Sequence, residues 1–370
     1  MNHFKLRKKI DISIPTVGIM LSLFGLVMVL SSSQISAAES FGNAYFFFIR
    51  QLLAWIVGMA LFFYYLRIPI EKLYEQRSIY LMVTLFLLVA VLIFGPRIAS
   101  VHRWIDLGFF RFQPAEFAKL FLIIYFAGWF AAKGDMVRHL LKGFLPFLAI
   151  LGLVGGLIIL EPDMGTMLVV VMISMVMFFI AKANLFHYLS LAIIGILILF
   201  LLVRIAPYRA ERLATFLGKD SGTQDTLGSA YHNQQALIAI GSGGMWGKGF
   251  GQGISKYSYL PQSHTDSIFA VVAEELGFVR TTLVLMAYVY IGWRGYIIAQ
   301  RANSRFVKLL AIGIAVALPL QALINIGGML HIIPLTGVPL PLVSYGGSSL
   351  VVSLAMLGLL TNASREITDG

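Results

Sequence analysis

The sequence has 370 residues, of which 59% are hydrophobic and only 12% charged, and its mean hydropathy is +0.85. A chain this apolar cannot cover a water-soluble core with polar surface, so an ordinary soluble protein is excluded and a single integral membrane domain over residues 1–370 is predicted. The net charge of +11 does not indicate nucleic acid, because Lys and Arg fall in short segments between apolar runs, where the head groups of a lipid bilayer explain them. With no cysteine, the chain has neither a disulfide framework nor a thiolate metal site.

Apolar runs of the length that a membrane-spanning helix needs recur along the whole chain. They lie at about 12–30, 48–66, 78–95, 116–132, 144–161, 164–181, 186–205, 281–299, 309–330 and 344–362. The first run could belong to a cleaved signal peptide, but its length favours a retained helix. The pattern predicts an all-α polytopic membrane protein of about ten transmembrane helices, with a large extracytoplasmic loop at 206–265 between helices 7 and 8.

The basic residues between these runs predict the orientation of the chain. If the N-terminus is cytoplasmic, most of them lie on the cytoplasmic side, as the positive-inside rule favours, and an even number of spans returns the C-terminus to the same side. Two predicted outer loops, 96–115 and 206–265, are also basic. We therefore expect an anionic ligand at the outer face, near Arg103, Arg209, Arg212 and Lys248.

Ionisable residues within apolar runs are costly, and a function is the default expectation for them. Glu116 and Lys119 share one helical face, so they either neutralise each other within the packing or line a polar cavity in which Lys119 meets phosphate. Glu161 and Asp163 flank Pro162 between two runs. Asp163 suits a helix N-cap, and alternatively it binds sugar hydroxyls or a cation.

A glycine-rich stretch, 241–253, lies in the large loop and contains Lys248. It is not a Walker motif, because Ser242 stands where that motif has glycine and Gly249 where it has Ser or Thr. Two alternatives remain. The stretch is either a mobile connector or a flexible backbone whose N–H groups, together with Lys248, close around a diphosphate.

His264, Thr265 and Asp266 follow at the start of an apolar helix. Together with Ser263 they do not indicate a hydrolase triad, because a triad is defined by its spatial arrangement and not by adjacency in sequence. Asp266 is either a helix N-cap or a general base at the water boundary, beside cations that bind an anionic leaving group.

The segment 331–350 joins the last two runs and is uncharged and rich in Pro and Gly. Irregular backbone at membrane depth is tolerated where it is buried in protein or lines a cavity. Ser344 in this segment therefore either belongs to a cavity wall or packs closely against a helix.

Six motifs occur in one order along nearly the whole chain: WIDLGFFRFQPAEFAKL, EPDMGT, YRAERL, AIGSGGMWGKGFGQG, LPQSHTDSIFAVVAEELGF and PLPLVSYGGSS. In this combination the chain resembles the SEDS family of shape, elongation, division and sporulation proteins. The stretches FGLVMVLSSS, KYSYLPQSHTD and QALINIGG are more similar to the division member FtsW than to the elongation member RodA, although GVPLPLVSYGG also suits RodA.

The resemblance implies ten transmembrane helices and peptidoglycan glycosyltransferase activity on lipid II at the outer face of the bacterial inner (cytoplasmic) membrane, in septal cell-wall synthesis. It also implies a class B penicillin-binding protein and other divisome proteins as partners. The family's essential aspartate matches Asp266, and its glutamate and lysine match Glu116 and Lys119. Ala115 stands where the family usually has serine.

Two further positions depart from the family pattern. His102 replaces the first arginine of a usual pair before tryptophan, so that Arg103 is the cation left at that place. Arg280 follows EELGF, where the family generally has small residues. We expect Arg280 to snorkel to the membrane edge or to pair with Glu274 or Glu275.

The resulting hypothesis is a general-base mechanism. Asp266 deprotonates the 4-hydroxyl of the N-acetylglucosamine of an acceptor lipid II, which attacks the anomeric carbon of N-acetylmuramic acid in the donor, an undecaprenyl-diphosphate-linked glycan, with inversion. Undecaprenyl diphosphate leaves, and its charge is stabilised by Arg103, Lys119, Arg209 and Lys248. Mg²⁺ or another divalent cation is an open expectation, with Asp163 and Asp266 as candidate ligands. The candidate substrate-binding residues are Arg103, Glu116, Lys119, Asp163, Arg209, Arg212, Lys248, His264, Thr265 and Ser344.

Two other classes of function remain. A transporter that flips lipid II would use Glu116, Lys119 and Asp163 as its pathway, but no inverted repeat or matched pair of broken helices is evident. A scaffold that recruits the transpeptidase explains the helices but not the polar residues of the large loop.

Overall fold

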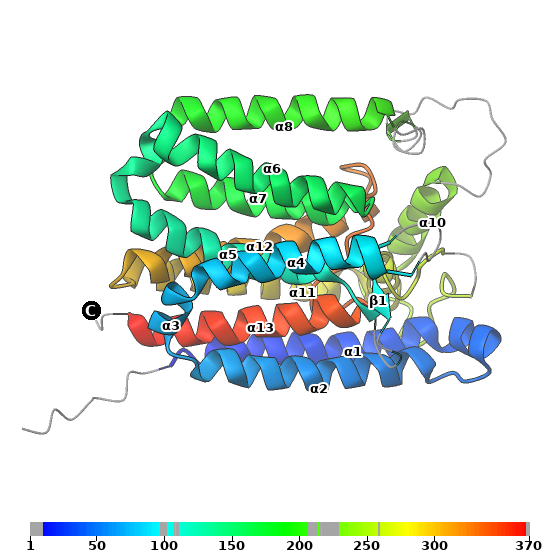
Figure 1. The fold of residues 1–370 in the computed structure, drawn as a ribbon. Helices are drawn as coiled ribbons and strands as arrows, with labels where there is room; N and C mark the ends of the chain where they lie inside the picture. Colours follow the sequence, from blue (N-terminus) through cyan, green and yellow to red (C-terminus); the bar gives the residue numbers. More distant parts are fainter. Residues whose placement is uncertain are drawn as a thin grey trace, which may run out of the picture.

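The computed structural model describes most of the chain as a bundle of long helices (Figure 1). The described residues are 10–96, 102–106, 108, 111–205, 210, 213–214, 216, 229–257 and 260–367. The helices are α1 (Ser13–Phe41), α2 (Phe46–Arg67), α3 (Ile70–Glu75), α4 (Arg77–Phe94), α5 (Pro114–Lys133), α6 (Leu145–Leu160), α7 (Met164–Ile180), α8 (Leu185–Ile205), α10 (Ser229–Ser242), α11 (Ile268–Arg301), α12 (Arg305–Met329) and α13 (Gly347–Ala363). Two short strands, β1 (Ile105–Asp106) and β2 (Arg111–Phe112), pair antiparallel.

The helices account for the predicted number of membrane spans. Within the described residues, eight helices are long and apolar enough to cross a membrane. Two further helices bring the number of spans to ten. One is α7, an apolar helix of 17 residues. The other is α11, which bends at Gly277, where a φ of 76° separates a short first segment from a long second one. The prediction of about ten spanning helices in an all-α membrane protein is confirmed.

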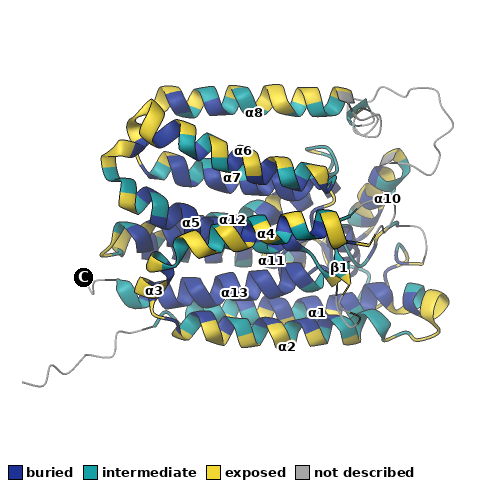
Figure 2. Cartoon of the chain, viewed as in Figure 1, coloured by how far each residue is buried: buried dark blue, intermediate teal, exposed yellow. Residues whose placement is uncertain are grey.

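Burial differs strongly between the helices (Figure 2). In the most apolar segment of each helix, 94% of the residues are buried in α13, compared with 17% in α4 and 11% in α8. The outer helices nevertheless expose large apolar side chains such as Phe86 and Phe200. This pattern is typical of a membrane protein, in which lipid takes the place of water around the bundle.

Helix α1 is longer than the first apolar run, which was predicted to end at about residue 30. Ser31, Ser32 and Ser33 interrupt the apolar pattern, but they continue the helix and are buried. The Ser31 hydroxyl donates to the carboxylate of Glu275, so it faces a polar partner inside the protein. The helix ends at Gly42, whose φ of 66° is easily adopted by glycine.

Both ends of the described chain lie at the same end of the bundle. The Asp11 amide donates to the Ser364 hydroxyl at 3.0 Å, and Ala302 forms a bridge with Ile367. The opposite end, on the right of Figure 1, carries the described residues between α1 and α2, α4 and α5, α6 and α7, α8 and α11, and α12 and α13. We call this opposite end the loop end. Helix α10 and the β1–β2 hairpin belong to it, and neither was predicted.

Candidate active site at the loop end

Asp266 precedes α11 at the loop end and is half-buried. The N-cap of α11 is Ser267, so the interpretation of Asp266 as an N-cap is wrong. The Ser267 hydroxyl donates to the carbonyl of Pro261 at 2.9 Å, and it lies 2.6 Å from the imidazole Nε2 of His232 in α10. Helix α10 therefore helps to fix the turn from which Asp266 projects.

The segment around Asp266 is held by three other parts of the bundle. The Ser263 hydroxyl donates to the Ser32 carbonyl in α1 at 3.2 Å. The Tyr345 amide donates to the His264 carbonyl at 2.8 Å. The Asn325 side-chain amide in α12 donates to the Asp266 carbonyl at 2.8 Å.

His264 lies against aromatic rings. Its ring centroid is 4.3 Å from that of Phe47 and 5.6 Å from that of Tyr345. Burial lowers the pKa of His264 to about 4, so the imidazole is neutral at physiological pH. The neutral imidazole therefore fills space beside Asp266 and adds no positive charge there.

Two arginines that were not among the predicted site residues act on the neighbouring Tyr345. Burial raises the pKa of Tyr345, and the charges of Arg50 and Arg111 oppose that effect. Arg50 lies in the second turn of α2, where it was counted as part of an apolar run, and its guanidinium stacks 4.4 Å from the centre of Phe46. Its position inside an apolar run was the available signal.

A short strap, residues 336–340, passes beside Asp266. A methyl group built on Gly337 would lie 3.5 Å from Oδ2 of Asp266, so this glycine borders the carboxylate. On its other side, the strap touches the first turn of α7, because a methyl group on Gly165 would meet the carbonyl oxygen of Thr336 at 2.6 Å. The strap therefore runs between Asp266 and the start of α7.

Asp163 caps α7, as one of the two interpretations predicted. Its carboxylate accepts the Thr166 amide at 3.0 Å and the Thr166 hydroxyl at 2.9 Å. It also accepts the side-chain amide of Gln113 at 2.7 Å. These bonds occupy both carboxylate oxygens and tie α7 to the residue before α5.

Glu161 and Arg103 meet at the turn between α6 and α7. The Arg103 guanidinium donates to the backbone carbonyls of Glu161, at 2.8 Å, and of Pro162. Neither carboxylate oxygen of Glu161 has a hydrogen-bond partner among the described residues, although the side chain is fully buried. Burial and the charge of the neighbouring Asp163 raise the pKa of Glu161 to about 9, although the charge of Arg103 opposes them. Glu161 is therefore protonated at neutral pH.

The described residues do not form a preformed divalent cation site. They contain no group of three or more His, Asp and Glu side chains placed to hold a metal ion. Asp163, one of the two predicted ligands, already accepts three hydrogen bonds. Mg²⁺ needs several oxygen ligands that converge, and this donor set does not supply them.

Glu116 and Lys119 form a buried ion pair. The Lys119 ammonium lies 2.7 Å from Glu116 Oε2, and both side chains are almost completely buried. The ammonium also donates to Gln321 Oε1 at 2.5 Å, and the Gln321 amide donates to the Pro339 carbonyl of the strap at 2.9 Å. The packing interpretation therefore describes this pair, and Lys119 does not face an open cavity.

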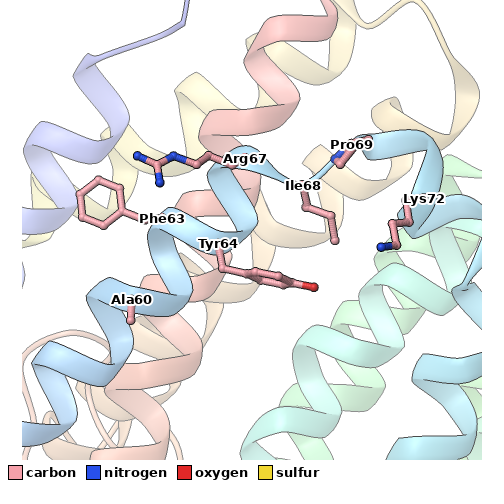
Figure 3. A pocket seen from close by; sticks show the side chains of 7 residues that line it. All are labelled: Ala60, Phe63, Tyr64, Arg67, Ile68, Pro69 and Lys72. Carbon is pink, nitrogen blue, oxygen red and sulfur yellow. The ribbon is translucent and has the colours of Figure 1, made fainter.

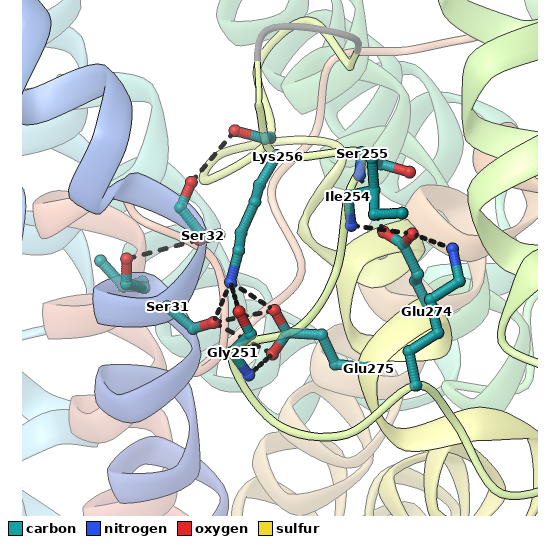
Figure 4. A network of polar contacts seen from close by, with 11 residues as sticks. Ser31, Ser32, Gly251, Ile254, Ser255, Lys256, Glu274 and Glu275 are labelled. Atoms are coloured by element: carbon teal, nitrogen blue, oxygen red, sulfur yellow. Dashed lines mark hydrogen bonds and ion pairs between the residues drawn. The ribbon is translucent and has the colours of Figure 1, made fainter.

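The glycine-rich stretch is anchored by Glu274, which corrects the prediction of a flexible cradle (Figure 4). The Lys248 ammonium lies 2.7 Å from Glu274 Oε1, and the amides of Ile254 and Ser255 donate to the same carboxylate at 3.0 and 3.1 Å. Lys248 retains some exposure, at 30% of its side chain.

The adjacent Glu275 anchors the same stretch to α1 (Figure 4). Its carboxylate accepts the Lys256 ammonium at 2.8 Å, the Gly251 amide at 3.0 Å and the Ser31 hydroxyl at 2.9 Å. Because both glutamates are engaged in this way, the expected pairing of Arg280 with one of them is wrong. Arg280 instead donates to the Trp246 carbonyl at 3.4 Å.

The remaining predicted site residues do not form one cluster. The Ser344 hydroxyl accepts the Leu340 amide at 2.7 Å, so this buried residue holds the strap. Thr265 is half-buried and donates to the side chain of Gln262 at 2.7 Å. Arg209 and Arg212 lie outside the described residues.

A cavity of about 500 Å³ lies at the other end of the bundle, where α2 turns into α3 (Figure 3). It is lined by Ala60, Phe63, Tyr64, Arg67, Ile68, Pro69 and Lys72. None of these residues was predicted to take part in the chemistry, and the Asp266 segment is at the opposite end. The cavity therefore does not belong to the candidate active site.

A family model described as a cell cycle protein, named for FtsW, RodA and SpoVE, matches residues 11–369. The chain belongs to this family. The chain is 39% identical to the probable peptidoglycan glycosyltransferase FtsW of Idiomarina loihiensis, over 95% of this chain and 86% of that one. It is 37% identical to the stage V sporulation protein E of Bacillus subtilis, over 96% of this chain and 97% of that one.

Two solved structures have the same fold as this chain. A chain of a peptidoglycan synthase complex, described in terms of the coordination of polymerization and crosslinking, superposes with a TM-score of 0.76 at 29% identity, covering 96% of this chain and 98% of that one. The rod shape determining protein RodA of Thermus thermophilus has a TM-score of 0.71 at 27% identity, with 98% of both chains covered. The resemblance to SEDS proteins is thereby confirmed.

Proposed function

We propose that this protein is a peptidoglycan glycosyltransferase that polymerises lipid II into glycan strands during septal cell-wall synthesis. The name that the FtsW relatives carry supports the activity, and the identity extends over nearly the whole chain. The observation that carries the proposal to a specific site is the position of Asp266, a half-buried carboxylate at the loop end, held by bonds from three other parts of the bundle. The proposal places the loop end outside the bacterial inner membrane and both termini in the cytoplasm.

In the proposed reaction, Asp266 takes the proton from the 4-hydroxyl of the acceptor N-acetylglucosamine. The acceptor oxygen forms a bond to the anomeric carbon of the donor N-acetylmuramic acid, and the bond from that carbon to the diphosphate oxygen breaks. Undecaprenyl diphosphate leaves with the electron pair, and the configuration at the anomeric carbon inverts. The half-buried position at the loop end suits a base, because the carboxylate lies where it can meet a substrate hydroxyl at the water boundary.

The cations that would stabilise the leaving diphosphate differ from those first expected. Lys119 is enclosed by its partners and is removed from the set. Lys248 keeps partial exposure beside Glu274, and Arg50 and Arg111 act near Tyr345 and His264. We propose these three cations for the two diphosphates of donor and acceptor, because preorganised positive charge lowers the barrier to diphosphate departure. Arg103 supports the neighbouring turn through its carbonyl bonds.

The test is polymerisation of purified lipid II by the purified protein, followed as glycan products on a gel. The Asp266→Asn variant is expected to fold and to form no glycan, and full activity of that variant would refute the assignment of the base. The assay is repeated with a class B penicillin-binding protein, since a similar fold occurs in a synthase complex that coordinates polymerization and crosslinking. Parallel reactions with Mg²⁺, with Mn²⁺ and with a chelator test the expected divalent cation.

The flippase and scaffold alternatives make different predictions. Glu116 and Lys119 are enclosed by each other and by Gln321, which does not suit a transport pathway. Lipid II translocation in proteoliposomes without glycan formation would support a transporter. Septal growth of cells that carry only the Asp266→Asn variant would support a scaffold.

A further inference from the structure

Helix α12 presents two buried amide side chains to the loop end. Gln321 and Asn325 are one helical turn apart, and they are 4% and 3% exposed. The Gln321 amide donates to the Pro339 carbonyl in the strap. The Asn325 amide reaches the same strap one residue earlier, at the carbonyl of Val338, over 2.7 Å. The strap is therefore fastened to α12 at two successive residues.

Asn325 also binds a second segment. Its Nδ2 donates to the backbone carbonyl of Asp266 at 2.8 Å, in addition to the bond to Val338. One amide nitrogen thus uses both of its hydrogens to join Asp266 to the strap. The orientation of the amide is determined by these bonds, because a flipped amide would place its oxygen against two carbonyl oxygens.

The strap matters to Asp266 because of Gly337, which is the neighbour of Val338. A methyl group on Gly337 would lie 3.5 Å from the Asp266 carboxylate oxygen. The backbone of Asp266 and the strap backbone that borders its carboxylate are therefore both hydrogen-bonded to Nδ2 of Asn325. A displacement of Asn325 would change the direction of the carboxylate relative to the strap, even if the rest of the bundle stayed in place.

We propose that Asn325 is a positioning residue for Asp266: it sets the direction in which the carboxylate meets the acceptor hydroxyl. This inference rests on the proposed function of Asp266 as the base. Proton transfer depends steeply on geometry, so a small misplacement lowers the turnover rate much more than it lowers substrate binding.

The chain contains a matched control for the structural cost of losing such an amide. Asn362 in α13 is 4% exposed, and its Nδ2 donates to the carbonyls of Tyr65 and Ile68 at 2.9 and 2.7 Å. Asn325 and Asn362 therefore have the same burial and the same pair of donated bonds. Asn362 makes its bonds at the end of α2, at the opposite end of the bundle from Asp266.

The experiment compares Asn325→Ala with Asn362→Ala in the full-length protein. Thermal unfolding in detergent is expected to show similar losses of stability. With purified lipid II, Asn325→Ala is expected to lower kcat by about 10- to 100-fold with little change in KM, which is the size of effect that misplacement of a reacting group produces. Asn362→Ala is expected to keep kcat within about twofold of the wild type, in line with a role outside the reaction.

Equal kcat values for the two variants would overturn the positioning role. If Asn325→Ala does not yield folded protein, Asn325→Ser, which keeps a single donor, replaces it and is judged by the same split between kcat and KM. Asp266→Asn is measured alongside. Activity of Asp266→Asn would refute the base itself, whereas an inactive Asp266→Asn together with an unchanged kcat of the Asn325 variant would refute the positioning role alone.

Discussion

Lys256 and Glu275 form a buried ion pair in which the ammonium nitrogen lies 2.8 Å from Oε1 and the side chains are 5% and 0% exposed. The Lys256 ammonium also donates to the Gly251 carbonyl, so the pair joins the glycine-rich stretch to α11, and the Ser31 hydroxyl extends it to α1. A charge in such surroundings is tolerated because its partner and its hydrogen bonds replace the lost water. The pair thus turns a glycine-rich sequence, which would otherwise favour a mobile loop, into a fixed part of the loop end.

Replacing Lys256 with Met is expected to destabilise the protein by about 3–5 kcal/mol, because the Glu275 carboxylate would remain buried without its counterion. Thermal or denaturant unfolding in detergent measures the loss. The exposed Lys308, replaced by Met, is the control and is expected to change stability by about 0.5 kcal/mol or less. A Lys256→Met protein as stable as that control would contradict the assignment of the pair as a structural anchor.

Glu161 predicts a dependence of stability on pH. Its pKa is about 9 in the folded protein and 4.5 in the absence of the fold, chiefly because of burial. The folded pKa is the higher one, so the contribution of Glu161 to stability is complete below about pH 4.5 and is lost as the pH rises towards 9. The Glu161→Gln variant stays neutral, and its stability relative to the wild type is expected to increase over that range.

Unfolding midpoints of the wild type and Glu161→Gln, measured across this pH range, test the prediction. Glu71→Gln, at an exposed position of α3, serves as the control. If the curves of the wild type and Glu161→Gln run parallel from acid to alkaline pH, Glu161 is not a buried neutral carboxyl group.

His264 predicts the opposite dependence. Burial lowers its pKa from 6.5 to about 4, so its contribution to stability is complete above about pH 6.5 and is lost as the pH falls towards 4. Phe at this position would keep the contacts with Phe47 and Tyr345 and would not titrate. His264→Phe is therefore expected to lose less stability on acidification than the wild type. Equal losses in circular dichroism melts between these pH values would disagree with a buried neutral imidazole.

The helices could be predicted from the sequence because the membrane requires long apolar runs. The exceptions have local causes. Ser31, Ser32 and Ser33 resemble the end of a span, but α1 continues through them. The Ser31 hydroxyl bonds to Glu275 of α11 and to Lys256 of the preceding loop, and the Ser32 carbonyl accepts the Ser263 hydroxyl. Helix α10 has ordinary polar composition and no spanning length, so hydropathy gives no signal for it.

The site could be predicted less completely than the fold. The Asp163 cap was one of two interpretations of its sequence position, and the structure shows it. Asp266 was identified through the resemblance to SEDS proteins, and its role as the base stays a prediction. The contact of Lys248 with Glu274 and that of Lys119 with Gln321 were not predicted. These partners are 26 and 202 residues away along the chain, respectively. Basic residues in an outer loop indicate an anionic ligand only if no acidic side chain of the protein pairs with them. Here the fold brings such an acidic side chain from a distant part of the sequence.

The last prediction concerns Gly337, which combines a left-handed backbone with proximity to Asp266. Its φ is 71°, so alanine would be strained there by roughly 1 kcal/mol, and the added methyl group would also contact Asp266 Oδ2 at 3.5 Å. Gly42 has a similar φ of 66°, but no atom lies within 4 Å of a methyl group at that position. Gly42→Ala therefore reproduces the backbone strain without the contact.

Both glycine variants are expected to lose similar stability, measured as the unfolding midpoint in detergent. Only Gly337→Ala is expected to reduce lipid II polymerisation, by about tenfold or more, because the methyl group occupies space beside the carboxylate that the acceptor hydroxyl needs. Equal polymerisation rates for the two variants would show that the strap does not limit access to Asp266. A loss of activity in Gly337→Ala alone would place the reacting hydroxyl on the side of Asp266 that faces the strap.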